Sequence, residues 1–134
     1  MTEDGRRESA LAEFALADEE LNIADSLLHA GFARVALTRA YFAVFHAARA
    51  RLYAAGFEPR THAGVQHLFN QHFVQTDRFE PGVSRLIARL QKYREEADYS
   101  RAFVIDAAGA REEVEAARAF VEAVRAQLPA TEGG

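Results

Sequence analysis

The stretch LTRAYFAVFHAA, residues 37–48, decides the fold of this chain. Its apolar side chains recur at intervals of three and four, the period of an α-helix, at Leu37, Tyr41, Val44 and Ala48. Alanines and two phenylalanines, Phe42 and Phe45, occupy much of the remaining helix surface. We therefore expect a helix over residues 32–55 that is apolar almost all round. Such a helix is either central in a bundle or buried against a second subunit, and on this ground we predict a homodimer.

The same period extends on both sides of this stretch and predicts four more helices, over residues 6–30, 62–75, 81–100 and 107–128. Gly31 and Gly56 lie in the short breaks between them, and the turn Glu80-Pro81-Gly82 marks the start of the helix over 81–100. Short connections make successive helices antiparallel. The prediction is an all-α fold, an up-and-down four-helix bundle with one additional short helix. We expect a single domain over residues 1–134, with a core over about 8–128 and a tail over 129–134.

Composition excludes several classes of protein. The 134 residues include no cysteine, which rules out disulfides and thiolate metal sites. The five histidines lack the spacing of a metal site, so we expect neither a metal nor a cofactor. No run approaches the roughly 18 apolar residues of a membrane helix, and the polar first residues do not resemble a signal peptide. We expect a cytoplasmic protein.

Charge is unevenly distributed along the chain. Residues 1–33 carry two arginines and eight acids, a net charge of −6. Residues 34–101 carry ten arginines and Lys92 against six acids, a net charge of +5, and residues 102–134 return to −3. The abundance of arginine has two explanations, the codon usage of a GC-rich genome or selection of guanidinium groups for phosphate. Any anion site should lie in the middle segment.

The first candidate site is a stripe on the expected helix 32–55. Its residues are spaced three, four, three and four apart, at Arg39, Phe42, His46, Arg49 and Tyr53. Arg39 and His46 lie about 10 Å apart along the helix. They could bind a phosphate and shuttle a proton during RNA cleavage. Alternatively, Arg39 pairs with an acid of the first helix, and His46 is a histidine of the core whose hydrogen bonds are satisfied within the fold.

The second candidate lies on the expected helix 81–100. Arg94 and Asp98 share a face with Arg101, which is the pattern of a surface ion-pair ladder. Tyr99 follows Asp98 and could bury its ring while its hydroxyl stays in water. A separate basic stripe on this helix would suit an anionic partner; it comprises Arg85, Arg89 and Lys92.

Three segments in this order resemble the HEPN (higher eukaryotes and prokaryotes nucleotide-binding) domain family, in particular its small prokaryotic branch. They are the segment LTRAYFAVFHAA at 37–48, the segment THAGV at 61–65 and the segment REEADY at 94–99, which contains Arg94, Asp98 and Tyr99. The resemblance covers about residues 10–125. It implies a bundle of four or five helices, usually a homodimer, that often pairs with a minimal nucleotidyltransferase in toxin–antitoxin-like modules. Many members of the family are metal-independent ribonucleases that use an arginine and a histidine separated by a gap of four to six residues, contributed by both subunits to a cleft at their interface.

The sequence departs from that catalytic pattern. In the family the arginine and histidine lie on the helix that matches residues 81–100, where Arg94 is followed by Asp98 and Tyr99 instead of a histidine. Our leading hypothesis is a non-enzymatic or weakly enzymatic module that binds nucleotide or RNA and a nucleotidyltransferase partner. Its cleft would be lined by Arg39, His46, Arg94, Asp98 and Tyr99. The alternatives are a metal-independent ribonuclease toxin, with Arg39 and His46 or Arg94 in catalysis, and a purely structural helical scaffold.

Overall fold

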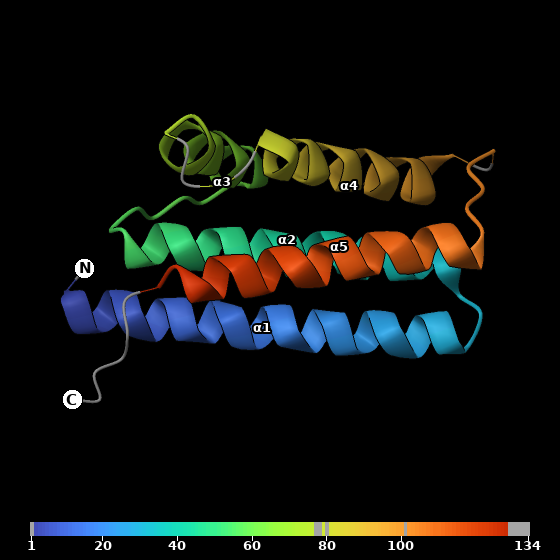
Figure 1. The fold of residues 1–134 in the computed structure, drawn as a ribbon, viewed down its shortest axis with the longest axis horizontal. Coiled ribbons are helices and arrows are strands. Elements are labelled where there is room, and N and C mark those ends of the chain that lie inside the picture. Colours follow the sequence, from blue (N-terminus) through green and yellow to red (C-terminus); the bar gives the residue numbers. More distant parts are fainter. Residues whose placement is uncertain (1, 77–78, 80, 101, 129–134) are drawn as a thin grey trace.

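The computed structural model describes residues 2–76, 79, 81–100 and 102–128, and within them it confirms the all-α fold (Figure 1). The elements in chain order are α1 (Glu3–His29), α2 (Ala33–Ala54), α3 (His62–Phe69), a π-helical turn η1 (Asn70–Val74), α4 (Pro81–Tyr99) and α5 (Ala107–Ala126). In Figure 1, α1 and α4 run in one direction, and α2 and α5 run in the other. No helix in the described part of the chain is long and apolar enough to cross a membrane.

The helices begin and end where local chemistry satisfies their free backbone groups. The side chains of Thr2, Thr61 and Asp106 accept hydrogen bonds from backbone N–H groups in the first turns of α1, α3 and α5. Gly31 follows α1 with φ of 89° and Gly56 follows α2 with φ of 96°, a conformation that costs glycine little. After each glycine the chain donates back into the last turn of the helix, so that both helices end in a Schellman motif.

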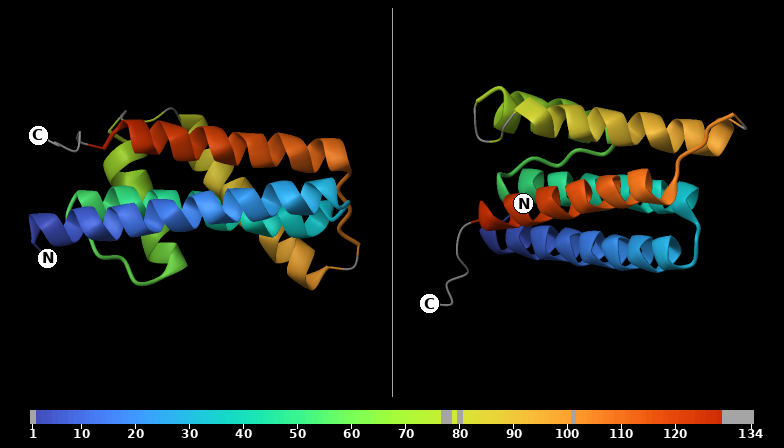
Figure 2. Two further views of the ribbon diagram at one scale, coloured as in Figure 1. Left: turned by 90° about the horizontal axis from the view of Figure 1, so that it is seen from below. Right: turned by 45° about the vertical axis from the view of Figure 1, so that its right-hand side comes forward.

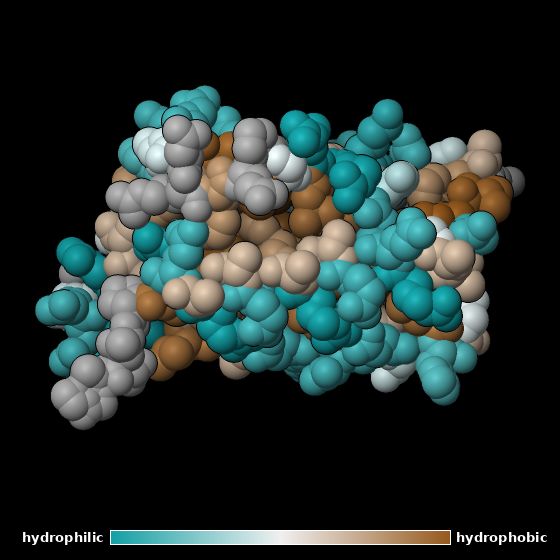
Figure 3. Space-filling model, viewed as in Figure 1, coloured by the Kyte–Doolittle hydropathy of each residue, from teal (hydrophilic) through white to brown (hydrophobic). Residues whose placement is uncertain are grey.

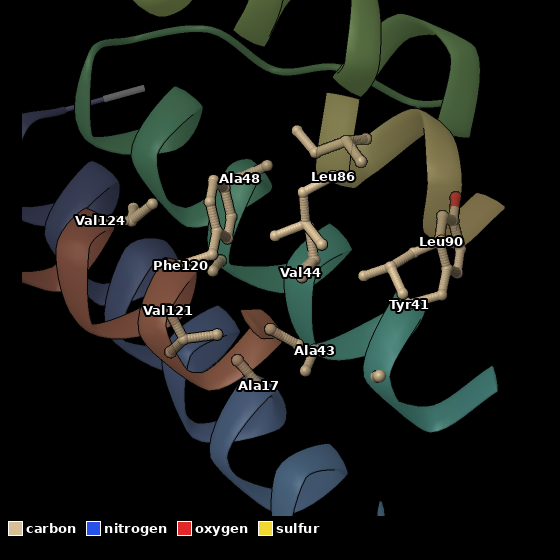
Figure 4. Close-up of a cluster of buried hydrophobic side chains, with 14 of the residues drawn as sticks. Ala17, Tyr41, Ala43, Val44, Ala48, Leu86, Leu90, Phe120, Val121 and Val124 are labelled. Carbon is tan, nitrogen blue, oxygen red and sulfur yellow. The ribbon is translucent and has the colours of Figure 1, made fainter. Parts of the chain in front are cut away.

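The core is built around α2, which packs on α1, α3, α4 and α5 (Figures 1 and 4). The four apolar positions expected to face inward from α2 are buried, at Leu37, Tyr41, Val44 and Ala48, and Leu52 one turn further on is buried with them. Alanines at 43, 47 and 50 are fully buried as well and allow the neighbouring helices to approach closely. Figure 4 shows Ala43 near Ala17 of α1 and Val44 near Leu86 of α4. The helix is therefore central, one of the two placements that its composition predicted.

This arrangement corrects the ground on which a homodimer was expected. We expected α2 to be too apolar for one bundle to cover, yet four other helices cover it within a single chain. The fully buried positions lie on several sides of α2 and none of them needs a second subunit. The apolar character of α2 is therefore not an argument for a dimer, and that prediction now depends on other observations.

The third helix is shorter than expected. The period predicted one helix over residues 62–75, but α3 ends at Phe69 and the chain continues as the π-helical turn η1. The amide of Gln75 donates to the carbonyl of Asn70, 2.9 Å away, which is the spacing of a π-turn. The wider turn buries Phe73 and leaves His72 half-buried against the ring of Phe57.

Two layers lie on opposite sides of α2, and Figure 2 shows them from two further directions. α1 packs along one side of α2 and against α5, while α3 and α4 lie across the other side (Figures 1 and 2). Ion pairs join α5 to α1 and to α4: Arg125 pairs with Asp18 and Arg118 with Asp25 on α1, and Glu113 pairs with Arg89 of α4. The expected tail, residues 129–134, lies outside the described residues.

Candidate functional site

The stripe predicted on α2 lies at the junction of the two layers. Arg39, Phe42, His46, Arg49 and Tyr53 are all half-buried, because one edge of the stripe meets α1 and the other meets α3 and α4. A half-buried position keeps part of each side chain in contact with water while its remaining surface is fixed by packing. The stripe is thus both accessible and ordered.

At the α1 edge, two carboxylates bind the cationic side chains of α2. Glu20 accepts from the Arg39 guanidinium at 3.1 Å. Glu13, which is only 8% exposed, lies 2.6 Å from Nδ1 of His46 and 3.5 Å from Arg49. These are the contacts that the structural interpretation of Arg39 and His46 predicted. Because Glu13 engages Nδ1, the imidazole of His46 has only Nε2 available for any other partner.

At the α3 edge lies a histidine that sequence reasoning did not select as a site residue. His62 stacks on Phe45 with ring centroids 4.2 Å apart, and its Nδ1 lies 2.7 Å from the hydroxyl of Tyr41. Burial lowers the pKa of His62, and the guanidinium groups of Arg94 and Arg49 lower it further. Burial raises the pKa of Tyr41. The neutral imidazole is therefore the acceptor and the phenol is the donor. The signal for His62 was its place in the segment THAGV, directly after the residue that caps α3.

At the α4 edge, Arg94 lies over two rings of α2. Its guanidinium carbon is 5.2 Å from the centroid of Tyr41 and 5.2 Å from that of Phe42. The guanidinium carbon of Arg39 is 5.3 Å from the centroid of Phe42. Two guanidinium groups from different helices therefore share one aromatic ring. We call this set of residues the arginine–aromatic cluster: Arg39, Tyr41, Phe42, Phe45, His46, Arg49, His62 and Arg94.

The structure brings three of the five candidate residues into this cluster and leaves two outside it. Arg39, His46 and Arg94 are members. Asp98 is exposed and Tyr99 is 86% exposed at the end of α4, so Tyr99 does not bury its ring as expected. The expected ion pair between Arg94 and Asp98 does not form, since Arg94 packs on the rings instead. Arg101 lies outside the described residues.

The charges of the two edges differ. Arg94 forms no ion pair with any carboxylate in the part of the chain that the structure describes. Guanidinium groups that stack on rings keep their N–H donors free at the edge of the plane, where phosphate oxygens bind. The adjoining rings offer faces on which bases stack.

Among the described residues, no group of three His, Asp or Glu side chains could hold a metal ion.

Comparison with known proteins agrees with the resemblance found in the sequence. The sequence model of the HEPN domain family matches residues 14–127. A protein of Methanocaldococcus jannaschii named "Putative toxin" is 36% identical over 94 residues, 70% of each chain. A UPF0332 protein of Pyrococcus horikoshii is 44% identical over 61 residues, 46% of this chain and 43% of its own. A UPF0332 protein of Thermotoga maritima is 26% identical over 113 residues, 84% of this chain and 82% of its own.

Proposed function

This chain belongs to the HEPN domain family, and from that premise we propose that it is the HEPN component of a toxin–antitoxin-like module and binds RNA or a nucleotide at the arginine–aromatic cluster. The relatives named as toxins support the first part of the proposal. The second part depends on the chemistry of the cluster, since a resemblance in fold does not identify a ligand.

One observation carries the binding proposal, the convergence of Arg39 and Arg94 on the ring of Phe42. The two guanidinium carbons lie 5.3 and 5.2 Å from the centroid of that ring, and only Arg39 has a carboxylate partner in the described chain, Glu20. A bound phosphate would use the donors that Arg94 leaves free. The cluster also lies in the segment of net charge +5 within a protein of net charge −4. The positive charge that would attract an anion is therefore concentrated in the segment that forms the cluster.

The test is a titration of single-stranded RNA against salt concentration. Binding through guanidinium groups releases counterions, so the logarithm of the affinity should fall linearly with the logarithm of salt. Replacing both Arg39 and Arg94 with Gln should reduce that slope by about 1.4 units, because each phosphate contact with a single strand contributes about 0.7. The matched control is Arg118→Gln, which removes an arginine of α5 that pairs with Asp25 away from the cluster. If the double variant keeps the affinity and the slope of the unchanged protein, the anion site is elsewhere.

We further propose that the partners are a second copy of the chain and a minimal nucleotidyltransferase. Exposed apolar side chains support a protein partner: Phe32, Val35, Tyr99 and Val104 are 47% to 86% exposed. They lie where α1 meets α2 and where α4 meets α5, an end at which Figure 3 shows hydrophobic surface. Sedimentation equilibrium at tens of micromolar tests the dimer. Co-purification with the product of an adjacent nucleotidyltransferase reading frame tests the second partner.

A second candidate function, metal-independent RNA cleavage, has one observation in its favour. Glu13 holds His46 by Nδ1 and so orients Nε2, as a carboxylate orients the imidazole in an acid–base pair. On the helix that resembles the catalytic helix of the family's ribonucleases, Arg94 is followed by the exposed Asp98 and Tyr99, and no histidine follows it in the sequence. We expect no robust cleavage of structured RNA in EDTA. Cleavage that is lost in a folded His46→Ala variant would establish the ribonuclease instead.

A further inference from the structure

One side chain in the first turn of α2, Arg34, binds the end of α4. Its Nε donates to the carbonyl oxygen of Ala97 at 2.7 Å, and its Nη2 donates both to Ala97 and to the carbonyl oxygen of Ser100, at 2.8 Å from the latter. The guanidinium carbon also lies 6.0 Å from the centroid of the Phe103 ring, in the segment that follows α4. A single arginine therefore joins the start of α2, the end of α4 and the chain beyond it.

The local sequence of α2 does not explain this arginine, but the sequence of α4 does. A cation in the first turn of α2 is unfavourable, because the positive end of the helix dipole lies there. The end of α4 carries Glu95, Glu96 and Asp98, and its last turn contains no basic residue. Acids at the negative end of a dipole are unfavourable, and the last carbonyl groups of a helix lack partners within it. Arg34 supplies the cation and the hydrogen-bond donors that α4 lacks.

The contact of Arg34 lies one turn beyond Arg94, the residue of α4 that belongs to the arginine–aromatic cluster. Of the described residues of α4 beyond Leu90, only Ala97 is buried, and its side chain is a single methyl group. Apolar contact is not directional, whereas a hydrogen bond requires a particular distance and angle. The hydrogen bonds from Arg34 therefore fix the position of the last turns of α4 on α2 more closely than packing alone.

We propose that Arg34 is a positioning residue for the anion site, because it holds the end of α4 where Arg94 lies over Tyr41 and Phe42. The guanidinium carbon of Arg94 is 5.2 Å from both ring centroids, so a small slide or rotation of α4 would move it off one of them. Arg34 acts through Arg94 and not on the ligand, since its Nε and Nη2 donors are occupied by carbonyl groups of the chain. The inference rests on the proposed binding of an anion at the cluster.

The first test observes the position of Arg94 without any ligand. In NMR spectra of the full chain, the rings beneath Arg94 should displace its side-chain Nε–H resonance upfield, and Arg94→Gln identifies this resonance by its loss. Arg34→Lys keeps the charge but removes the planar group that donates to two carbonyls at once. We expect the resonance to move toward that of exposed arginines in Arg34→Lys. The matched control is Arg118→Lys, which weakens the contact between α5 and Asp25 of α1 and should leave the resonance in place.

The second test is the affinity for a fluorescein-labelled oligouridylate, measured by anisotropy at low salt. We expect Arg34→Lys to weaken binding about threefold and Arg94→Gln about fivefold, with Arg118→Lys unchanged. The double variant should bind as Arg94→Gln does, because a residue that acts only through Arg94 has no effect once Arg94 is replaced.

The two tests separate failure of this inference from failure of the proposed function. An unmoved resonance in Arg34→Lys would overturn the positioning role, and so would losses of affinity that add in the double variant. If Arg94→Gln leaves the affinity unchanged, the anion site is not at the cluster, and the resonance alone then decides whether Arg34 positions Arg94.

Discussion

Positively charged side chains have different partners at the two edges of α2: carboxylates at the α1 edge and aromatic rings at the α4 edge. Toward α1, Arg39 and His46 each bind a carboxylate, and Glu13 is almost completely buried in doing so. Toward α4, Arg94 lies over the rings of Tyr41 and Phe42 and binds no carboxylate of the described chain. The first edge is electrostatically complete, whereas the second leaves donors for an external anion. Arg39 and Arg94 are both arginines beside Phe42, yet one is neutralised by a carboxylate and the other is not. The partner that the neighbouring helix supplies therefore decides whether an arginine here is available to a ligand.

The largest effect should follow from adding bulk and charge to the closed edge. Ala43 is fully buried where α2 meets α1. Ala43→Arg should lower the free energy of unfolding by about 3–5 kcal/mol, because it buries an unpaired charge and overfills a close helix contact. Chemical denaturation measures this change. Ala119→Arg, the same substitution at an exposed site, should stay within about 0.5 kcal/mol, and equal losses would contradict the packing described here.

The second-largest loss of stability should follow from removing the charge of one carboxylate at the α1 edge. Glu13→Gln leaves His46 and Arg49 beside a neutral amide in a half-buried place, so we expect a loss of about 2 kcal/mol of unfolding free energy. Arg94→Gln should cost about 1 kcal/mol or less, since it removes only contacts with rings. Denaturant titration of both variants compares the two edges directly. A costlier Arg94→Gln would reverse the contrast between them.

A smaller effect should appear in anion binding when Glu20 is neutralised. Glu20→Gln frees the Arg39 guanidinium from its ion pair and makes the first edge resemble the second. We expect RNA affinity to rise about threefold at low salt, with the gain shrinking as salt increases. Fluorescence anisotropy with a labelled oligonucleotide measures it. Asp25→Asn, which breaks the distant pair with Arg118, should produce no such gain.

The smallest effect is a pH dependence centred on His62. Its pKa is lowered in the folded protein from an ordinary value of 6.5, so the unfolded chain binds the proton more readily. The stabilisation is fully present above pH 6.5 and is lost as pH falls through the folded pKa. The groups that face His62 are Tyr41, Phe45, Arg94 and Arg49.

Thermal unfolding between pH 7.5 and 5 measures this dependence. His62→Gln should reduce the slope, whereas His67→Gln, at an exposed position of the same helix, should leave it as it is. An unchanged slope in His62→Gln would mean that other groups control stability in this range.

Periodicity predicted the helices well because their apolar faces are local features of the chain. Leu37, Tyr41, Val44 and Ala48 of α2 were expected to face inward, and all four are buried. Thr61 and Gly56 show why helix limits were approximately right, since capping chemistry lies within a few residues of each end. The π-helical turn was missed because no local pattern distinguishes it from a continuing helix.

The site was only partly predictable, because its contacts depend on the register between helices. The sequence predicted, as one alternative, that Arg39 would pair with an acid of the first helix, but it did not identify Glu20 as that acid or Glu13 as the partner of His46. His62 was missed as a site residue because its partner Tyr41 precedes it by 21 residues, and only the packing of α3 brings them together. Arg94 was selected, but its position over Phe42 instead of beside Asp98 required the structure.

The central position of α2 also determines how the molecule opens. Every other helix packs on α2, so its amide groups can reach water only when the whole bundle comes apart. The layer of α3 and α4 covers one side of α2 only, and its separation would leave α1, α2 and α5 together. Amide protons of α2 should therefore exchange with deuterium at the rate of global unfolding, while those of α3 exchange through smaller and more frequent openings. The arginine–aromatic cluster lies along the boundary where those openings begin.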